Sequence, residues 1–278
     1  NVADSSQIGV APVQALWTIY PPSTQTITDR FMKVRAYIEV TTDQPHQLGT
    51  NDGVRQFPLN SIVDVTTCQI NGESISDNTG DKLHAMLCYG NDREDRRKSW
   101  SMTASQPDSF QNYGDWTTLG SARNPLAEYG ENSSEPTRGS LPVTVVSPTV
   151  FRVVVTEALM LSPFYQGLGA QEEGFVNVNQ FNISLRFKSD AGRVLCHSSA
   201  GAAITTSSVT FYQHPEMLTT FITPDLTEPI PALQVLPYHK PQDYIKTMAP
   251  LADGATTRVI SDSIKLSQIP RRIYLFCR

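Results

Sequence analysis

The residues best suited to metal chemistry are two pairs of cysteine and histidine. His84 and Cys88 are four positions apart in the segment 81–88, which could form a short helix of about two turns, and Cys196 directly precedes His197. Four such ligands could bind zinc in a tetrahedral site. The adjacent Cys-His pair has poor ligand geometry, however, and the spacing matches no zinc finger. We therefore expect no metal site, with buried thiols and surface histidines instead.

Nucleophilic catalysis would require a serine or cysteine beside a histidine that an acidic residue orients. The sequence has no G-x-S-x-G motif, and its five histidines are scattered along the chain: His46, His84, His197, His214 and His239. The segment GLGA at 167–170 lacks the lysine and the later glycine of a phosphate-binding loop. We therefore predict that the protein is not an enzyme and has no cofactor.

Alternating apolar and polar residues predict that β-strands position whatever surface the protein uses. In residues 181–187 (FNISLRF), phenylalanine, isoleucine and leucine alternate with polar residues, which is typical of a strand with one buried face. Residues 32–40 alternate in the same way. Between two further β-prone runs in residues 57–76, Asn71-Gly72 predicts a hairpin with a type I′ turn.

The remaining segments complete an all-β prediction. Residues 1–30 are expected to be an irregular arm, residues 89–142 a long loop, and residues 214–231 a linker punctuated by prolines. Further strands are predicted at 143–156, 204–212, 233–238 and 256–266, with 150–155 as an almost fully buried run.

Composition excludes several classes of protein. The chain has 278 residues, of which 39% are hydrophobic and 18% charged, and its formal net charge is −5. A dedicated nucleic-acid-binding protein would carry a basic patch, and no run approaches the ~20 apolar residues of a membrane helix. The four cysteines are far apart and are expected to be free: Cys68, Cys88, Cys196 and Cys277.

The order of these features resembles a known family, the double jelly-roll major capsid proteins of tailless icosahedral viruses (the PRD1–adenovirus-like lineage). The resemblance rests on FPLNSIVDVTTCQINGESIS with its Asn-Gly hairpin, on RNPLAEYGEN in the long loop, on TEALMLSPF leading into GFVNVNQFNISLRF, and on SIKLSQIPRRIYLFCR. These segments extend from about residue 30 to the C-terminus.

The resemblance implies a jelly roll, an eight-stranded β-sandwich, followed by the start of a second one. On this interpretation residues 1–29 are an arm, 30–214 the first jelly roll with an insertion loop at 89–142, 215–231 a linker, and 232–278 the opening strands of the second roll. The family further implies homotrimers that form pseudo-hexameric capsomers in an icosahedral virion assembled inside the host cell. Partners would be neighbouring capsomers and other virion proteins, such as penton or minor capsid proteins.

Residues 1–29 contain no lysine or arginine. Direct genome binding depends on neutralising phosphates, so we expect no strong nucleic-acid binding by this protein. The expected interface residues are aromatic, because tyrosine and tryptophan bury a large area and keep a polar tip. They are Trp17 and Tyr20 in the arm, and Trp100, Tyr113, Trp116 and Tyr129 in the loop.

Two alternatives remain open at this point. A receptor-binding or carbohydrate-binding β-sandwich, such as a fibre head, would use the same loop aromatics as a platform and would be a monomer or a small trimer. A jelly-roll enzyme of the cupin type would need clustered histidine and carboxylate ligands, which the scattered histidines do not favour.

Overall fold

The computed structural model describes residues 1–4, 6–48, 52–54, 57–80, 113–114, 141–164, 174–188, 194–197, 204–225, 234, 242–246, 256–258, 260, 263–266, 269–270 and 273. The chain divides into two compact units, residues 1–239 and 240–278. Every helix and strand of the described residues belongs to the first unit. In that part of the chain, no helix is long and apolar enough to cross a membrane.

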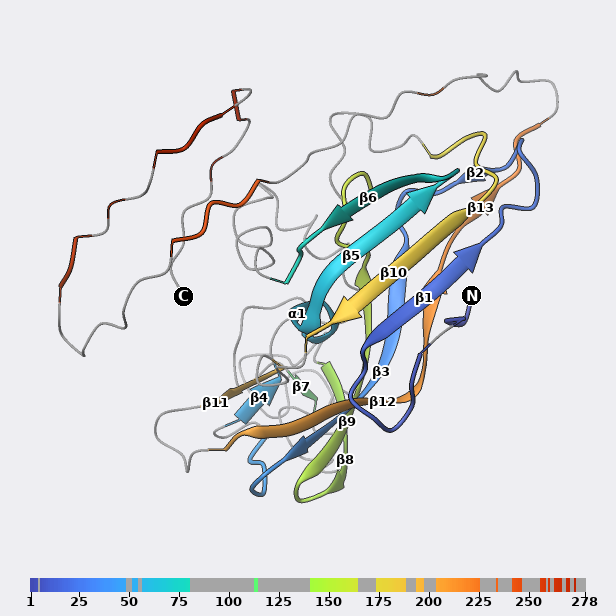
Figure 1. Cartoon of the computed structure of the whole chain (residues 1–278). Coiled ribbons are helices and arrows are strands. Elements are labelled where there is room, and N and C mark those ends of the chain that lie inside the picture. The colour runs from blue at the N-terminus through green and yellow to red at the C-terminus, as the bar shows by residue number, and fades with distance from the viewer. Residues whose placement is uncertain are drawn as a thin grey trace, which may run out of the picture. The chain divides into compact units, whose positions relative to one another are not determined.

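Two antiparallel sheets form the first unit (Figure 1). The four-stranded sheet has the order β1-β10-β5-β6, with β1 at Gln14–Ile19, β10 at Phe181–Phe187, β5 at Val63–Ile70 and β6 at Glu73–Asp77. The five-stranded sheet has the order β12-β3-β9-β8-β7, with β12 at Thr206–Leu218, β3 at Lys33–Thr42, β9 at Val150–Ala158, β8 at Leu141–Ser147 and β7 at Tyr113–Gly114. Among the strands of the described residues, the short pairing of β7 with β8 is parallel and the others are antiparallel.

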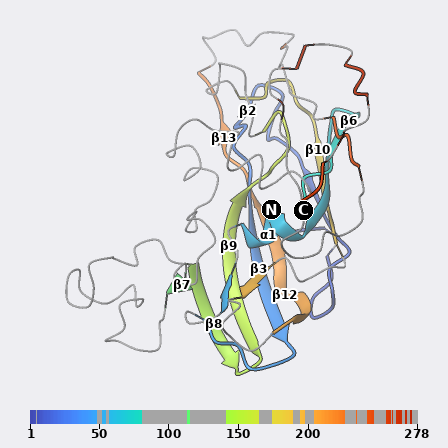
Figure 2. The ribbon, with the colours of Figure 1, turned by 90° about the vertical axis from the view of Figure 1, so that its left-hand side faces the viewer.

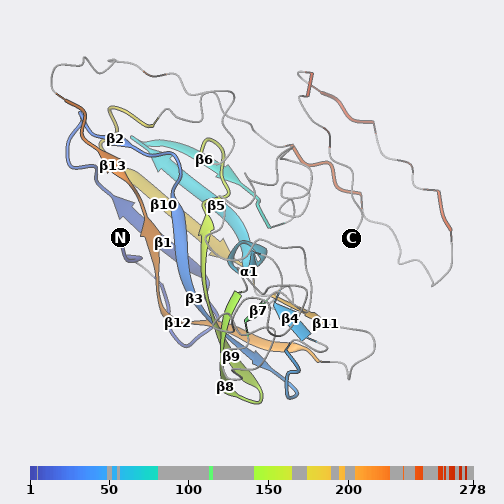
Figure 3. The same cartoon turned by 180° about the vertical axis from the view of Figure 1, so that it is seen from behind.

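Two short strand pairs and one helical turn complete the described part of the first unit. The strand pairs are β2 (Ile27–Thr28) with β13 (Phe221–Ile222), and β4 (Asp52–Val54) with β11 (Leu195–His197). A single helical turn, α1 (Pro58–Ile62), precedes β5, and all five of its residues are buried. The views from the side and from behind show β12, β3 and β9 as one layer and β1, β10 and β5 as the other (Figures 2 and 3).

The core lies between these layers, because each strand turns its apolar residues inward. In β3 every second residue from Val34 to Thr42 is buried, and β10 alternates in the same way. The rings of Phe187 on β10 and Phe211 on β12 meet edge to face with 5.2 Å between their centres. The protein is therefore a β-sandwich, and the predicted fold class is confirmed at that level.

The predicted hairpin is confirmed. Asn71 and Gly72 both have positive φ, 48° and 96°, and Ile70 pairs with Glu73 across the turn. This conformation suits a two-residue loop because its twist matches that of the strands it joins. The predicted strand at 204–212 also exists, although it continues to Leu218 as β12.

Several expected boundaries are wrong. Residues 1–29 are not an irregular arm, since β1 is a strand of the four-stranded sheet and β2 pairs with β13. The expected linker after residue 214 begins inside β12 and contains β13. Residues 143–156 form two strands, because Pro148 and Thr149 make a turn between β8 and β9. In β9, Arg152 and Val154 are half-buried, so residues 150–155 alternate where an almost fully buried run was expected.

Other expectations fall partly outside the described residues. The expected helix at 81–88 lies entirely outside them, as does most of the loop at 89–142. In the second unit, the described residues between 256 and 266 form no strand.

Candidate interaction surface

The outer face of the five-stranded sheet gathers charged and aromatic side chains. Alternation along β3 turns Val34, Ala36 and Ile38 inward, so the intervening residues point outward and are half-buried. Neighbouring strands add residues in register, with Glu39 paired to Arg152 and Arg35 to Glu216. We call six of these residues the sheet-face cluster: Arg35, Tyr37, Glu39, Arg152, Tyr212 and Glu216.

Arg152 links one half of the sheet-face cluster. Its Nε donates to Glu39 Oε2 over 2.7 Å, and its guanidinium carbon lies 4.6 Å from the centre of the Tyr212 ring. Tyr212 in turn meets Tyr37 edge to face, with 5.8 Å between ring centres. Partial burial raises the pKa of Tyr212 above its ordinary range.

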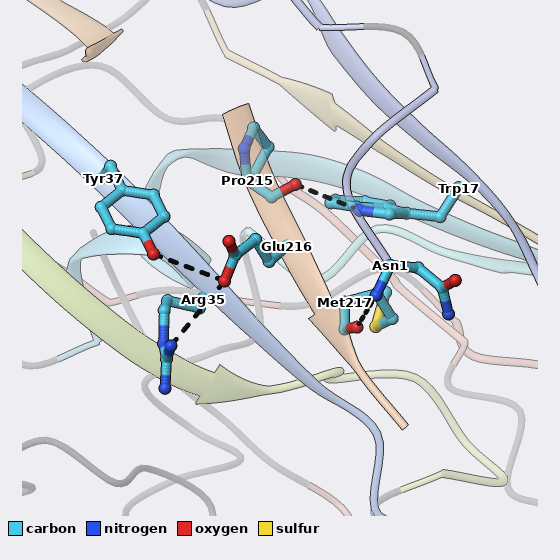
Figure 4. A network of polar contacts seen from close by, with 7 residues as sticks. All are labelled: Asn1, Trp17, Arg35, Tyr37, Pro215, Glu216 and Met217. Carbon is cyan, nitrogen blue, oxygen red and sulfur yellow. Dashed lines mark hydrogen bonds and ion pairs between the residues drawn. The ribbon is translucent and has the colours of Figure 1, made fainter. Parts of the chain in front are cut away.

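Glu216 links the other half (Figure 4). Its Oε2 accepts a hydrogen bond from Tyr37 Oη at 3.4 Å and lies 3.8 Å from Arg35 Nη1. The charged side chains of the cluster are between 25% and 42% exposed, and pairs exposed to this degree contribute about 0–1 kcal/mol to stability. The ion pairs of the cluster therefore add little to the stability of the fold. Tyrosine and arginine are enriched among the residues that dominate protein interfaces.

A second feature lies at the edge of the same sheet. Residues 1–4 and 6–9, which we call the N-terminal strap, extend antiparallel along β12. Backbone hydrogen bonds join Met217 N to Asn1 O (2.6 Å), Asn1 N to Met217 O (2.9 Å), Ala3 N to Pro215 O (3.0 Å) and Gly9 N to Phe211 O (2.9 Å). The strap also contacts the other sheet, because Asp4 N donates to Leu16 O and Thr18 N donates to Asp4 Oδ2. It therefore joins the edges of both sheets.

Beneath the strap, Trp17 connects the two sheets (Figure 4). This residue of β1 is fully buried, and its Nε1 donates to Pro215 O on β12 over 3.3 Å. Pro215 has no N–H to donate, and such residues occur in sheets only at edges or bulges. Pro215 meets both conditions, because β12 is an edge strand and its pairing with β3 is irregular between residues 211 and 216.

The predicted interface residues have different outcomes. Trp17 belongs to the core of its own chain, so its fully buried ring cannot contact a neighbour, and that prediction is corrected. Tyr20 is 66% exposed and stays a candidate. Only the backbone of Tyr113 is described, in β7. Trp100, Trp116 and Tyr129 lie outside the described residues.

Metal chemistry finds no support in the described part of the chain, where no group of three or more potential ligands could hold an ion. Cys196 and His197 are consecutive residues of β11, whereas His84 and Cys88 lie outside the described residues. Cys68 is free and buried, and burial raises the pKa of its thiol to about 12. This cysteine is therefore an inert core residue.

One buried carboxyl group organises the end of β9. Glu157 is fully buried; its Oε1 accepts from Leu59 N (2.9 Å), and its Oε2 accepts from Asn60 N (2.8 Å) and Asn60 Nδ2 (2.7 Å). Burial raises the pKa of Glu157 to about 7, although the three donors act in the opposite direction. The carboxyl group thus fixes α1 against the five-stranded sheet.

Sequence reasoning missed both the sheet-face cluster and the strap. The alternation of residues 32–40 indicated that Arg35, Tyr37 and Glu39 share one face, and this was the available signal for half of the cluster. The partners on β9 and β12 depend on strand order and register, which no local pattern reveals.

Comparisons with known proteins match a large part of this chain. The profile of the family described as Sputnik virophage major capsid protein first domain matches residues 2–150. The putative capsid protein V20 of Sputnik virophage is 29% identical over 280 residues, which cover 93% of this chain and 46% of that protein.

Two solved structures have a similar fold. A chain in the 3.5 Å cryo-EM structure of the Sputnik virophage is 27% identical with a TM-score of 0.58, over 83% of this chain and 50% of that one. The crystal structure of the mavirus major capsid protein has a TM-score of 0.54 at 14% identity, over 83% of this chain and 47% of that one, and this likeness shows the fold alone. The chain thus spans about half the length of these relatives.

Proposed function

Because the chain belongs to the family of the Sputnik virophage major capsid protein first domain, we propose that it is a virion capsid subunit that acts by self-assembly. The observation that carries this proposal is the family match over more than half of the chain. Its likeness to a chain of the Sputnik virophage particle, at 27% identity, supports a location in the virion shell.

The resemblance to double jelly-roll capsid proteins also suggests how the domains and copies of the protein are arranged. We propose that residues 30–214 form one jelly roll of a double jelly-roll protein, that residues 232–278 begin the second, and that three copies form a pseudo-hexameric capsomer of an icosahedral shell.

The sheet-face cluster is our candidate for a contact between copies. It combines two tyrosines, two arginines and two carboxylates on a sheet face, so it can offer both apolar area and complementary charges to a neighbour. Tyr20 is a second candidate contact, and neighbouring capsomers or minor virion proteins are the proposed partners.

The proposed role is structural and not enzymatic. Residues 1–29 lack basic side chains, so we also propose that another virion component packs the genome. Gel-shift titration with double-stranded DNA checks this second proposal. Binding that is tight at 50 mM salt and lost at 200 mM would contradict it, because such salt dependence marks phosphate contacts.

Light scattering of the full-length protein over rising concentration tests the self-assembly. The wild type is expected to be a trimer that enlarges further. Arg152→Glu places a carboxylate beside Glu39 and should shift the mass toward the monomer. Arg186→Glu is the matched control, because it breaks an exposed ion pair with Asp64 on the other sheet and should leave the trimer intact. A monomeric wild type at every concentration would refute the proposed function.

A further inference from the structure

The N-terminal strap contributes little to the core of its own chain. Its apolar side chains Val2 and Ile8 are 56% and 46% exposed, and Val10 and Val13, which follow it, are 49% and 65% exposed. Only Ala3 packs against the core, and then as a partly buried residue. The strap is therefore held mainly by the backbone hydrogen bonds to β12 and by its contacts with β1.

The strap nevertheless has defined hydrogen-bond partners on β12. Phe211 O, Pro215 O and Met217 O each accept from the strap, and Met217 N donates to it. Ser6 Oγ and His214 Nδ1 lie 2.6 Å apart and add a side-chain hydrogen bond. An edge strand with unpaired backbone groups readily accepts another strand, so β12 would attract another strand if its own strap moved away.

The segment between the strap and β1 has the features of a hinge. Gly9 has a φ of +74°, and a Cβ added there would meet nothing within 4 Å. Residues 10 and 11 are exposed, whereas Pro12 is buried and Val13 O accepts from Phe187 N over 3.0 Å. The chain is thus anchored from Pro12 onward, and the rotation would occur at Gly9. A rotation at Gly9 would swing the strap away from β12 and would release the bonds of Asp4 to Leu16 and Thr18 of β1. The pairing of β1 with β10, which covers Gln14 to Ile19, would stay in place.

We propose that the N-terminal strap is exchanged between copies, so that the strap of one chain pairs with β12 of a neighbour. A second copy is the occupant that fits, because its strap reproduces every contact of the intramolecular one. Exchange then loses no contact, and a high local concentration of copies favours it. The inference rests on the proposed self-assembly for that local concentration.

A mixed disulfide experiment detects the exchange directly. Val2 and Glu216 lie opposite each other between the bonds that join Asn1 to Met217 and Ala3 to Pro215. Cβ atoms of such a non-hydrogen-bonded pair are close enough for a disulfide. One preparation carries Val2→Cys and the other Glu216→Cys, with different affinity tags. They are mixed, concentrated and oxidised, and the linked peptides are identified by mass spectrometry.

Two controls make the result interpretable. The double variant Val2→Cys/Glu216→Cys in one chain shows by its disulfide that the geometry allows the bond. A mixture of Thr67→Cys and Ser76→Cys chains tests a directly paired position of β5 and β6, which the Asn71-Gly72 turn keeps within one chain. This control pair should not link different chains.

We expect disulfides between residues 2 and 216 of different chains, at several times the level of the control pair. If the double variant links within one chain but the mixture forms no bond between chains, strap exchange is refuted. Glu216 belongs to the sheet-face cluster, so light scattering is measured on the wild type as well as on the mixed variants. Trimers of the mixed variants without the mixed disulfide refute exchange alone, whereas monomers of the wild type at every concentration refute self-assembly.

Discussion

Replacing Glu157 by alanine should be among the most damaging single changes in the sandwich. The carboxyl group is fully buried and accepts from two backbone N–H groups of α1 and from the side chain of Asn60. Alanine removes the acceptor and leaves the N–H groups of Leu59 and Asn60 buried. Asn60 Nδ2 retains a second acceptor, since Ala158 O lies 3.3 Å away.

The size of the effect follows from these contacts. Each buried donor left without an acceptor costs about 1–3 kcal/mol, so the two backbone groups together cost about 2–6 kcal/mol. The free energy of unfolding of a typical domain is only about 5–15 kcal/mol. The melting temperature should therefore fall by about 4–24 °C, since 1 kcal/mol corresponds to about 2–4 °C in a domain of this size.

Urea unfolding followed by tryptophan fluorescence measures the change, with thermal unfolding as a second readout. Glu73→Ala is the matched control, because Glu73 is an exposed residue on edge strand β6 and its loss should change the free energy of unfolding by less than about 0.5 kcal/mol. If Glu157→Ala destabilises no more than this control, α1 is not held by the carboxyl group and the reasoning fails.

Three further predictions concern stability. Burial raises the pKa of Glu157 to about 7 from an ordinary 4.5, so between these pH values the folded chain binds a proton that the unfolded chain has released. The free energy of unfolding should therefore fall by up to about 3 kcal/mol as the pH rises from 4.5 to 7. Urea unfolding at a series of pH values measures this slope, which should be absent in Glu157→Gln. Trp17→Ala should cost about 3–5 kcal/mol in urea unfolding, whereas Trp17→Phe should cost less than half of that, because the smaller aromatic ring still fills most of the site. Gly72→Val should lower the melting temperature by a few degrees, because a φ of 96° costs a β-branched residue about 1–2 kcal/mol, and an unchanged melting temperature would contradict the type I′ turn.

The sequence predicted those parts of the fold that local patterns determine. Alternation fixes which residues of β3 and β10 face the core, and Asn71-Gly72 fixes the β5–β6 hairpin, because both depend on neighbouring residues alone. The resemblance to double jelly-roll capsid proteins identified the fold class, and the family match supports it.

What the sequence did not reveal depends on distant partners. β1 alternates as β3 does, yet Trp17 looked like an arm residue because the polar segments around it hide a six-residue strand. The sheet-face cluster joins residues from β3, β9 and β12, and the strap pairs residues more than 200 positions apart. Only the order of strands in the sheets brings such residues together, so no spacing in the sequence could have predicted these surfaces.

Negative-stain electron microscopy of the concentrated full-length protein tests the central proposal of capsid self-assembly most directly. The capsid interpretation predicts particles with three-fold symmetry that go on to form hexagonal sheets or closed shells as the concentration rises. Particles of single-copy size at every concentration and salt condition would contradict it.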